Sequence, residues 1–514
     1  MGAMKRRRVG AWLVALGSMG GGLAGCGKPE APPVPAAERF RGVKLIVGVV
    51  GDPTLLRSIA AQRGEWVAKT GSELVLRDGP VDPKAPGDVD AVIFAGERLG
   101  DLVDAGVLAT LPESLVAAPA ASAPADPGAE AAPPAPDPFR FAEIAPAFRN
   151  RVGRYGPDRF GLPIGGSALV VAFNRRAFDQ PELIEAARAA NVKLGPPATW
   201  NEFDALARFC HGRDLDGDGQ PDSGVALPWG ADAEGVGDAV FLARAAASAL
   251  HPDQYDFLLD SETTAPRVAT PPFVATLQAL VALREAGPPG GAGFDAPAAR
   301  AAFRAGRVAL LVDRAEAAAT WGTGQFAIGV APLPGSTRVY DPSRSAWESP
   351  GTPNRPFYLP SGGGWLVGVA ARSAHREVAE AFARYLAEPE TTDRLRSERD
   401  FPMLAVRTPQ LARGLLNPRS APGVEPRAWA DAVARTLGGD KVVPGLRIPE
   451  APGYLADVAA ARATAIAGRP AEEALQALAA AWAKRTQALG PARQTWHHRR
   501  SLDGPSTAAE PPAR

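Results

Sequence analysis

A run of alternating aspartates at residues 214–222 is the clearest metal-like motif in the sequence. Carboxylates at alternate positions followed by glycine match the first half of a calcium-binding loop, in which oxygen atoms converge on a hard cation. A complete loop of that kind has a glutamate at its twelfth position, where this chain has Val225. We therefore expect no catalytic cofactor and at most a small structural calcium site. Its candidate ligands are Asp214, Asp216, Asp218 and Asp222.

Residues that could perform catalysis are few and scattered. The chain has only five histidines, which lack metal-ligand spacing, and it has no serine elbow and no phosphate-binding loop motif. Cys210 beside His211 could suggest a nucleophile, but neighbours on a helix point in different directions, and a buried thiol is the better interpretation. We expect a protein that is not an enzyme. A pair of carboxylates suited to glycoside hydrolysis could still be drawn from the many acidic residues, so a surface glycosidase stays an alternative.

Cys26 is the residue with the most specific sequence context. A basic cluster at residues 5–8 precedes an apolar run at 11–16, and small residues lead to Leu23-Ala24-Gly25-Cys26. This order is typical of an export signal, and its end resembles the bacterial lipobox, whose cysteine is acylated and becomes the first mature residue. The apolar run is well short of the roughly 20 residues that span a bilayer. Residues 1–25 are therefore predicted to be a lipoprotein signal peptide, with Cys26 as the lipidated residue.

The segment that follows is predicted to be a tether. Residues 26–39 are rich in proline and alanine, a composition that stays extended and does not pack. We expect a soluble, extracytoplasmic body, anchored to a membrane by the N-terminal lipid, on the periplasmic side or at the cell surface. Without residues 1–25 the chain has 52 basic and 56 acidic side chains, a formal charge of −4, and it shows no basic stripe. Nucleic acid is therefore not expected as a partner.

The body needs a hydrophobic core, because Cys210 alone remains once Cys26 is acylated and no internal disulfide can form. The 489 mature residues exceed what one core usually organises, so two lobes are predicted. Apolar strands alternate with amphipathic helices, which indicates α/β lobes with parallel strands. The predicted strands are 43–50, 74–76, 91–94, 169–174, 308–313, 326–331 and 365–369, and the predicted helices include 55–67, 99–106, 203–209, 378–386 and 471–482.

Several short motifs, taken in order, resemble the extracellular solute-binding proteins of ABC transporters, in the carbohydrate-binding group that includes maltose-binding-type proteins. They extend over about 450 residues, and each is weak alone. The matching motifs are the tyrosine-glycine to leucine-proline stretch at 155–163, Asn174 at the end of a strand, the helix start at 197–200, the phenylalanine to glycine lead-in at 303–306, the glycine-tryptophan crossing at 362–365 and the closing helix at 471–482.

This resemblance implies a type II periplasmic-binding-protein-like fold, with two α/β lobes, several crossovers and a ligand cleft between the lobes. Carried over, lobe one comprises 40–165 and a return at 305–362. Lobe two comprises 166–304 and a return at 363–486. Residues 117–138, which are nearly all Ala, Pro, Ser, Gly and Asp, are predicted to be a disordered insertion, and residues 487–514 a disordered tail.

Aromatic and charged residues at strand ends are the candidate ligand contacts, because ligands of open α/β sheets bind beyond the carboxyl ends of strands. Sugars present apolar C–H faces and a rim of hydroxyl groups, which aromatic plates and charged partners can hold. Core packing is the competing interpretation for each tryptophan. The candidate ligand-binding residues are Asp52, Trp229, Asp313, Arg314, Trp321 and Trp365.

The implied function is that of a carrier, which closes around a small polar ligand, a carbohydrate by preference, and docks as a monomer on an ABC permease. A polyol, a peptide or an organic anion stays open as the ligand. A sensor that hands its loaded state to a receptor kinase is a second alternative to transport.

Overall fold

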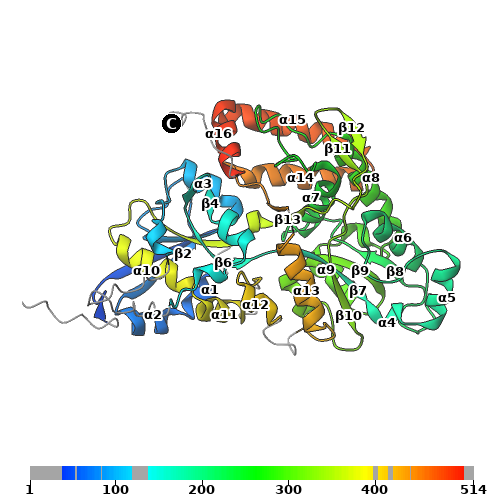
Figure 1. The fold of residues 1–514 in the computed structure, drawn as a ribbon, viewed down its shortest axis with the longest axis horizontal. Helices are drawn as coiled ribbons and strands as arrows, with labels where there is room; N and C mark the ends of the chain where they lie inside the picture. Colours follow the sequence, from blue (N-terminus) through cyan, green and yellow to red (C-terminus); the bar gives the residue numbers. More distant parts are fainter. Residues whose placement is uncertain are drawn as a thin grey trace, which may run out of the picture.

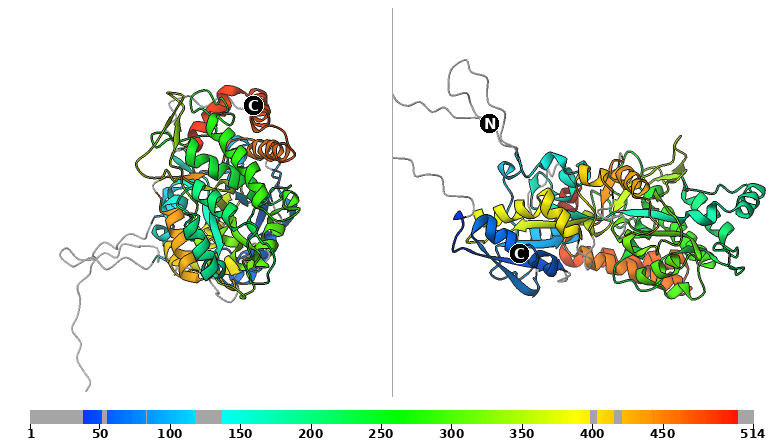
Figure 2. Two further views of the ribbon diagram at one scale, coloured as in Figure 1. Left: turned by 90° about the vertical axis from the view of Figure 1, so that its right-hand side faces the viewer. Right: turned by 90° about the horizontal axis from the view of Figure 1, so that it is seen from below.

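The computed structural model describes residues 38–51, 55–82, 84–117, 137–397, 403–414, 421–439 and 441–502. The predictions for Cys26 and Asp52, for most of the tether and for nearly all of the insertion at 117–138 lie outside these ranges. Within them the chain forms two lobes side by side, each built on its own central sheet (Figures 1 and 2). No helix among the described residues is long and apolar enough to cross a membrane.

The first lobe contains a five-stranded sheet in the order β2-β1-β3-β14-β6. β1 pairs in parallel with β2 and β3, whereas β14 pairs antiparallel with β3 and β6. The strands are nearly continuous apolar runs because both faces of the sheet are covered. Their bounds are Lys44–Val50 (β1), Glu73–Pro80 (β2), Ala91–Ala95 (β3), Leu162–Gly166 (β6) and Gly364–Val369 (β14).

Amphipathic helices cover the first sheet. Phe382 and Trp66 meet edge to face at 5.1 Å on one face of the sheet, which gives the predicted apolar stripe of residues 378–386 its partner. The opposite face packs on Leu99, Leu102 and Phe148. The helices of this lobe are α1 (Leu55–Ala60), α2 (Arg63–Thr70), α3 (Leu99–Asp104), α10 (Arg376–Leu386) and α11 (Pro389–Ser397).

The second lobe contains a four-stranded sheet in the order β10-β7-β9-β8. β7 pairs antiparallel with β9 and β10, and β8 pairs in parallel with β9. The strands are Leu169–Asn174 (β7), Ser223–Ala226 (β8), Val308–Arg314 (β9) and Ile328–Pro332 (β10). The helices packed around them are α4 (Arg175–Phe178), α5 (Pro181–Ala189), α6 (Trp200–Cys210), α7 (Val236–Ala249), α8 (Pro271–Leu283), α9 (Ala296–Arg304) and α13 (Pro426–Leu437).

Side-chain caps fix where several second-lobe helices begin. Asn174 accepts a hydrogen bond from the amide of Ala177 at the start of α4, and Thr199 accepts one from Glu202 at the start of α6. These oxygens satisfy amide groups that have no partner within the first helical turn. The two caps therefore give physical roles to Asn174 and to the helix start at 197–200, both of which the sequence had singled out.

The C-terminal region adds helices that lie against both lobes. α14 and α15 pack on each other and on α8 of the second lobe, whereas the last helix also contacts β4 of the first lobe (Figure 1). The remaining elements are α12 (Thr408–Ala412), α14 (Ala451–Ile466), α15 (Ala471–Leu489), α16 (Pro491–Ser501), β4 (Arg154–Tyr155), β5 (Asp158–Arg159), β11 (Val339–Asp341), β12 (Ala346–Glu348), β13 (Phe357–Leu359) and β15 (Val442–Pro444). Short helical turns are η2 (Gly96–Arg98), η3 (Glu113–Leu115), η4 (Phe141–Glu143), η5 (Phe148–Val152), η6 (Arg284–Ala286), η7 (Gly291–Gly293), η8 (Ala315–Thr320) and η9 (Ser361–Gly363).

Three of the predicted domain assignments are wrong. The segment 305–362 was expected to return to lobe one, but its strands β9 and β10 both pair with β7 of the second sheet. The segment 363–486 was expected to return to lobe two, but its first part does not, because β14 joins the first sheet and α10 packs on β14. Its later helices α13, α14 and α15 do pack on the second lobe. The tail from 487 was expected to be disordered, yet α16 is an ordered helix whose His497 and His498 are buried. Its residues 503–514 lie outside the described ranges.

Candidate functional site

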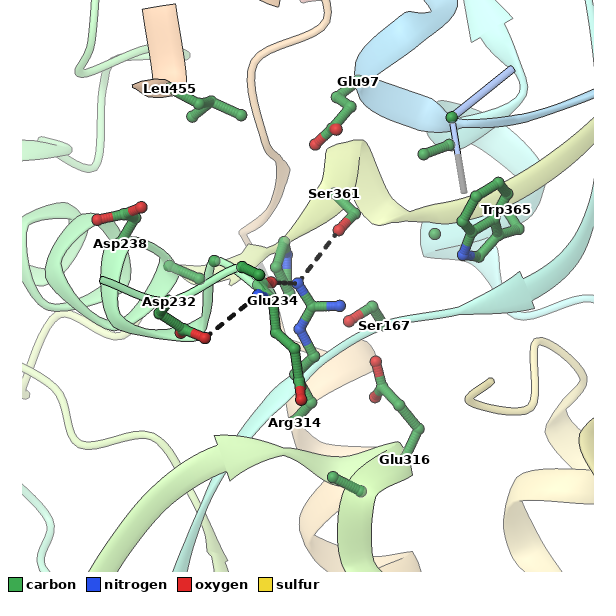
Figure 3. Close-up of a pocket in the computed structure, with 18 of the residues that line it drawn as sticks. Glu97, Ser167, Asp232, Glu234, Asp238, Arg314, Glu316, Ser361, Trp365 and Leu455 are labelled. Atoms are coloured by element: carbon green, nitrogen blue, oxygen red, sulfur yellow. Dashed lines mark hydrogen bonds between the residues drawn. The ribbon is translucent and has the colours of Figure 1, made fainter. Parts of the chain in front are cut away.

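A cavity of about 760 Å³ lies between the two lobes. The ends of β1 and β3 border it from the first lobe, the end of β9 and the start of α7 from the second, and α14 along one side. This is the position that open α/β sheets offer, beyond the carboxyl ends of strands. Its volume is within the range of small-molecule sites. Figure 3 shows the side chains that converge on it.

Arg314 stands at the end of β9 and links two segments that border the cavity. Its Nη2 donates to the backbone carbonyl of Glu234 at 2.6 Å and lies 3.4 Å from Oγ of Ser361 (Figure 3). Glu234 belongs to the loop before α7, and Ser361 belongs to the segment that crosses into the first lobe. Arg314 therefore joins the second-lobe wall of the cavity to the crossing segment.

Arg300 is held by two carboxylates at the edge of the cavity. Its guanidinium donates to both oxygens of Asp313 at 2.7 and 2.9 Å, and to both oxygens of Glu234 at 2.8 and 2.7 Å. Burial alone would lower the pKa of Arg300, but the hydrogen bonds and charges of these carboxylates outweigh it and raise the pKa. Arg300 is therefore a fixed, fully engaged cation.

Glu97 and Glu316 face the cavity from opposite lobes. Glu97 lies in η2 after β3, and Glu316 lies in η8 after β9. Burial raises the pKa of both carboxyl groups, against the opposing charge of Arg314 on each and of Arg98 on Glu97. Desolvation disfavours the charged form of a carboxyl group unless a cation or several donors compensate. Both groups are therefore well placed to gain from a ligand that donates hydrogen bonds.

Trp365 supplies an aromatic surface to the cavity at the start of β14. The three residues before it, Gly362, Gly363 and Gly364, have φ of 64°, 105° and 130°, which residues with a β-carbon rarely adopt. A β-carbon on Gly51 would stand 3.8 Å from the Trp365 ring, so the end of β1 passes close beside the indole. The glycines thus allow the chain to turn as it passes from one lobe to the other, and they place the Trp365 indole beside the cavity.

Residues 82–393 match the sequence profile described as bacterial extracellular solute-binding protein. The chain belongs to this family. The match covers more than half of the 514 residues. It includes the whole second sheet and the strands β3, β6 and β14 of the first. No curated protein sequence matches this chain.

Solved structures of the same family type share the fold at low sequence identity. An ABC transporter solute-binding protein from Agrobacterium radiobacter, in complex with ribitol, is 18% identical, with a TM-score of 0.60 over 88% of this chain and 100% of that one. One from Agrobacterium vitis, with bound D-mannitol, is 17% identical, with a TM-score of 0.58 over 87% and 99%. An ABC substrate-binding protein from Listeria monocytogenes, in complex with cycloalternan, is 16% identical, with a TM-score of 0.58 over 87% and 99%. The predicted periplasmic-binding-protein-like fold is confirmed.

Two of the six predicted ligand contacts border the cavity, namely Arg314 and Trp365. Three others are buried away from it, which contradicts their predicted role. Trp229 is 3% exposed and its indole donates to the carbonyl of Leu280, while Trp321 is fully buried and donates to Asp313. Asp313 itself is bound by Arg300. The sixth, Asp52, lies outside the described residues, although its neighbour Gly51 borders the cavity.

Sequence reasoning did not select the acidic residues that surround the cavity. Glu97 comes three residues after the predicted strand 91–94, and Glu316 comes two residues after Arg314, so strand-end position was an available signal for both. No signal marked the loop acids before α7, because their approach to the cavity depends on packing between lobes. The acids bordering the cavity are Glu97, Asp232, Glu234, Asp238 and Glu316.

The aspartate loop brings three of its four predicted metal ligands together. Carboxylate oxygens of Asp214, Asp216 and Asp218 lie within 4.8 Å of one another. Asp222 does not join them, because its Oδ2 accepts the amide of Leu215 at 2.8 Å. Arg307 already places a cation there, 2.6 Å from Asp218 and 3.5 Å from Asp216. Calcium binding by the remaining three stays a prediction.

Cys210 is a packing residue. It is fully buried at the end of α6, and burial raises the pKa of its thiol to about 12. A thiol with so high a pKa is almost wholly protonated at neutral pH and is a poor nucleophile. The interpretation of Cys210 as a buried thiol is confirmed.

Proposed function

We propose that this protein is a lipid-anchored carrier that captures a carbohydrate or a polyol outside the cytoplasm and delivers it to an ABC permease. The single observation that carries the proposal is the cavity between the lobes, which is lined by the aromatic residues Trp365 and Tyr358 and by carboxylates, guanidinium groups and hydroxyls. Family membership and the ribitol, mannitol and cycloalternan complexes of proteins with the same fold support this ligand class.

The cavity suits a ligand with apolar faces and many hydroxyl groups. The Trp365 indole can lie against C–H groups of a sugar ring or polyol chain. The carboxylates of Glu97 and Glu316 can accept hydrogen bonds from hydroxyls, and Arg314 and Ser361 can donate to them. Because the two lobes contribute different partners, only a closed arrangement satisfies all of them. The ligand thus stabilises closure, and closure reports loading without any chemical step.

Delivery requires a tether and a partner at the membrane. The signal sequence, Cys26 and the proline-rich segment 26–39 support anchoring by an N-terminal lipid. An anchored carrier stays near its permease at a high effective concentration, so even a modest affinity between the two suffices. Replacement of Cys26 by alanine should abolish incorporation of radiolabelled palmitate and release the protein from the membrane fraction. Continued labelling of the variant would contradict the anchor.

Thermal unfolding of the purified full-length protein against a panel of sugars and polyols tests the ligand class. A ligand at 100 times its dissociation constant adds about 2.7 kcal/mol to the free energy of unfolding, which raises the midpoint measurably. We expect a shift with at least one carbohydrate or polyol, and recovery of that compound unchanged. No shift across the panel would contradict the ligand class. Release of hydrolysis products would point instead to a glycosidase.

A further inference from the structure

The described residues that border the cavity carry an excess of negative charge. Five are acidic and three are arginines. A net negative field inside a cleft attracts cations and weakens the binding of anions. The size of this excess depends on whether the three arginines already pair with carboxylates.

Two of the three arginines are already committed to carboxylates. Arg300 is bound by Glu234 and also by Asp313, which stands behind the cavity wall, so that one cation faces two anions. Arg98 pairs with Asp101 at 3.3 Å. Arg314 is the third, and it donates to a carbonyl and a hydroxyl oxygen.

Two of the five acids are balanced by local partners. Asp238 is held by Arg462 at 2.8 Å. Asp232 accepts the amides of Glu234 and Gly237 at 3.2 and 3.0 Å at the start of α7, where the helix dipole also favours negative charge. Burial still raises the pKa of Asp238, but both groups have partners within the protein.

Glu97 and Glu316 have fewer partners. Among the residues that the structure describes, neither forms an ion pair, and neither accepts amides from two other residues as Asp232 does. Their carboxylates point into the cavity on either side of the Arg314 guanidinium (Figure 3). The amide of Ala168 approaches Glu316 at 3.4 Å.

Burial raises the pKa of both Glu97 and Glu316, against the charge of Arg314 on each. Arg98 also lies near Glu97 but pairs with Asp101. The two carboxylates therefore share one guanidinium, and the cavity can take one further positive charge between them.

We infer that the preferred ligand is a sugar or polyol that carries an ammonium group, held between Glu97 of the first lobe and Glu316 of the second. An ammonium donates up to three hydrogen bonds and its charge offsets the buried excess. A neutral hydroxyl in the same place donates one hydrogen bond and leaves the excess in place. This inference rests on the proposed function and narrows its ligand class.

Titration calorimetry with matched compounds tests the inference on the full-length protein. Three pairs exchange one hydroxyl for an ammonium, namely glucose with glucosamine, galactose with galactosamine, and sorbitol with 1-amino-1-deoxysorbitol. A fourth pair, cellobiose with fully deacetylated chitobiose, exchanges one hydroxyl on each sugar unit. Spermidine serves as a cation without sugar character. We expect the amine of at least one pair to bind at least tenfold more tightly than its neutral partner. Glu97→Gln and Glu316→Gln should each reduce that preference about tenfold, because they remove a charge while keeping size and hydrogen bonding.

The control is Glu185→Gln, an exposed change in α5 on the second lobe, which should keep the full preference. If neutral members bind as tightly as amines, the inference is wrong while the proposed function stands. If spermidine binds and no carbohydrate does, the proposed function is wrong and the cavity is a cation site of another class. If nothing binds, both are contradicted. If a variant fails to fold, the wild-type affinities for each amine and its neutral partner still test the inference.

Discussion

His497 and His498 are neighbours in α16, yet each contacts a carboxylate of a different lobe. His497 Nε2 lies 2.9 Å from Asp104 in α3 of the first lobe, and His498 Nε2 lies 2.6 Å from Asp256, in the segment between α7 and α8 of the second. Successive helical residues point about 100° apart, so one helix can reach both sides. α16 therefore connects the lobes outside the cavity.

Removal of one histidine should show how much this connection stabilises the fold. We expect His498→Ala to lower the free energy of unfolding by about 1–3 kcal/mol, because it leaves the buried carboxylate of Asp256 without its side-chain partner. Urea unfolding measures the change. Lys484→Ala, an exposed change on α15, is the control and should fall within about 0.5 kcal/mol of the parent. Equal stabilities of the two variants would contradict the role of α16.

Acid should weaken the same connection. Burial alone would raise the pKa of Asp104 and of Asp256. His497 and Arg493 instead lower the pKa of Asp104, and His498 and backbone amides lower that of Asp256. A carboxylate with a lowered folded-state pKa stabilises the fold above its unfolded value, near 3.9, and that stability is lost as the pH falls through the folded value. We expect stability to fall below about pH 4. Asp256→Asn should flatten this dependence, and parallel curves for variant and parent would contradict it.

The features of the fold that could be predicted from the sequence were individual strands and helices. The apolar runs of β1 and β3 and the stripe of α10 could be recognised because each depends on residues adjacent in sequence. The sheet that β9 joins could not be recognised, because its pairing with β7 spans more than 130 residues, and an apolar strand fits either sheet. The returning segments were assigned to the wrong lobes for this reason.

The same limit applies to the tryptophans. Trp229, Trp321 and Trp365 all follow turns, loops or glycines, and nothing in their local sequence separates a core side chain from a cavity wall. The structure buries the first two and leaves Trp365 at the cavity. By contrast, Trp66, Trp200 and Trp482 lie in helices with an apolar face, and all three are buried.

Two tryptophan variants distinguish a side chain that binds ligand from one that packs in the core. Trp365→Ala should weaken carbohydrate binding at least tenfold while the protein stays folded, because the indole borders the cavity and is only partly buried. Trp229→Ala should instead cost about 3–5 kcal/mol of stability, since it removes a buried ring that packs on Gly287. Calorimetric affinity and urea unfolding distinguish the two. An unaltered affinity of Trp365→Ala would contradict the assigned site.

The aspartate loop gives a separate prediction about calcium. If Asp214, Asp216 and Asp218 bind the ion, Arg307 competes for two of the same carboxylates. We expect calcium to raise the unfolding midpoint modestly, and Arg307→Gln to increase that shift. Asp216→Asn should remove it, and excess chelator should reverse it. Identical midpoints with calcium and with chelator in both parent and Arg307→Gln would show that the loop holds no calcium.

The central claim is that a carbohydrate or polyol binds between the lobes and leaves unchanged. Calorimetric titration of the full-length protein with the compound that most raises its unfolding midpoint, followed by mass spectrometry of the recovered compound, tests this claim most directly. The account predicts one molecule bound per chain, recovery of that molecule intact, and loss of binding in Trp365→Ala. Recovery of a cleaved product, or undiminished binding by Trp365→Ala, would contradict it.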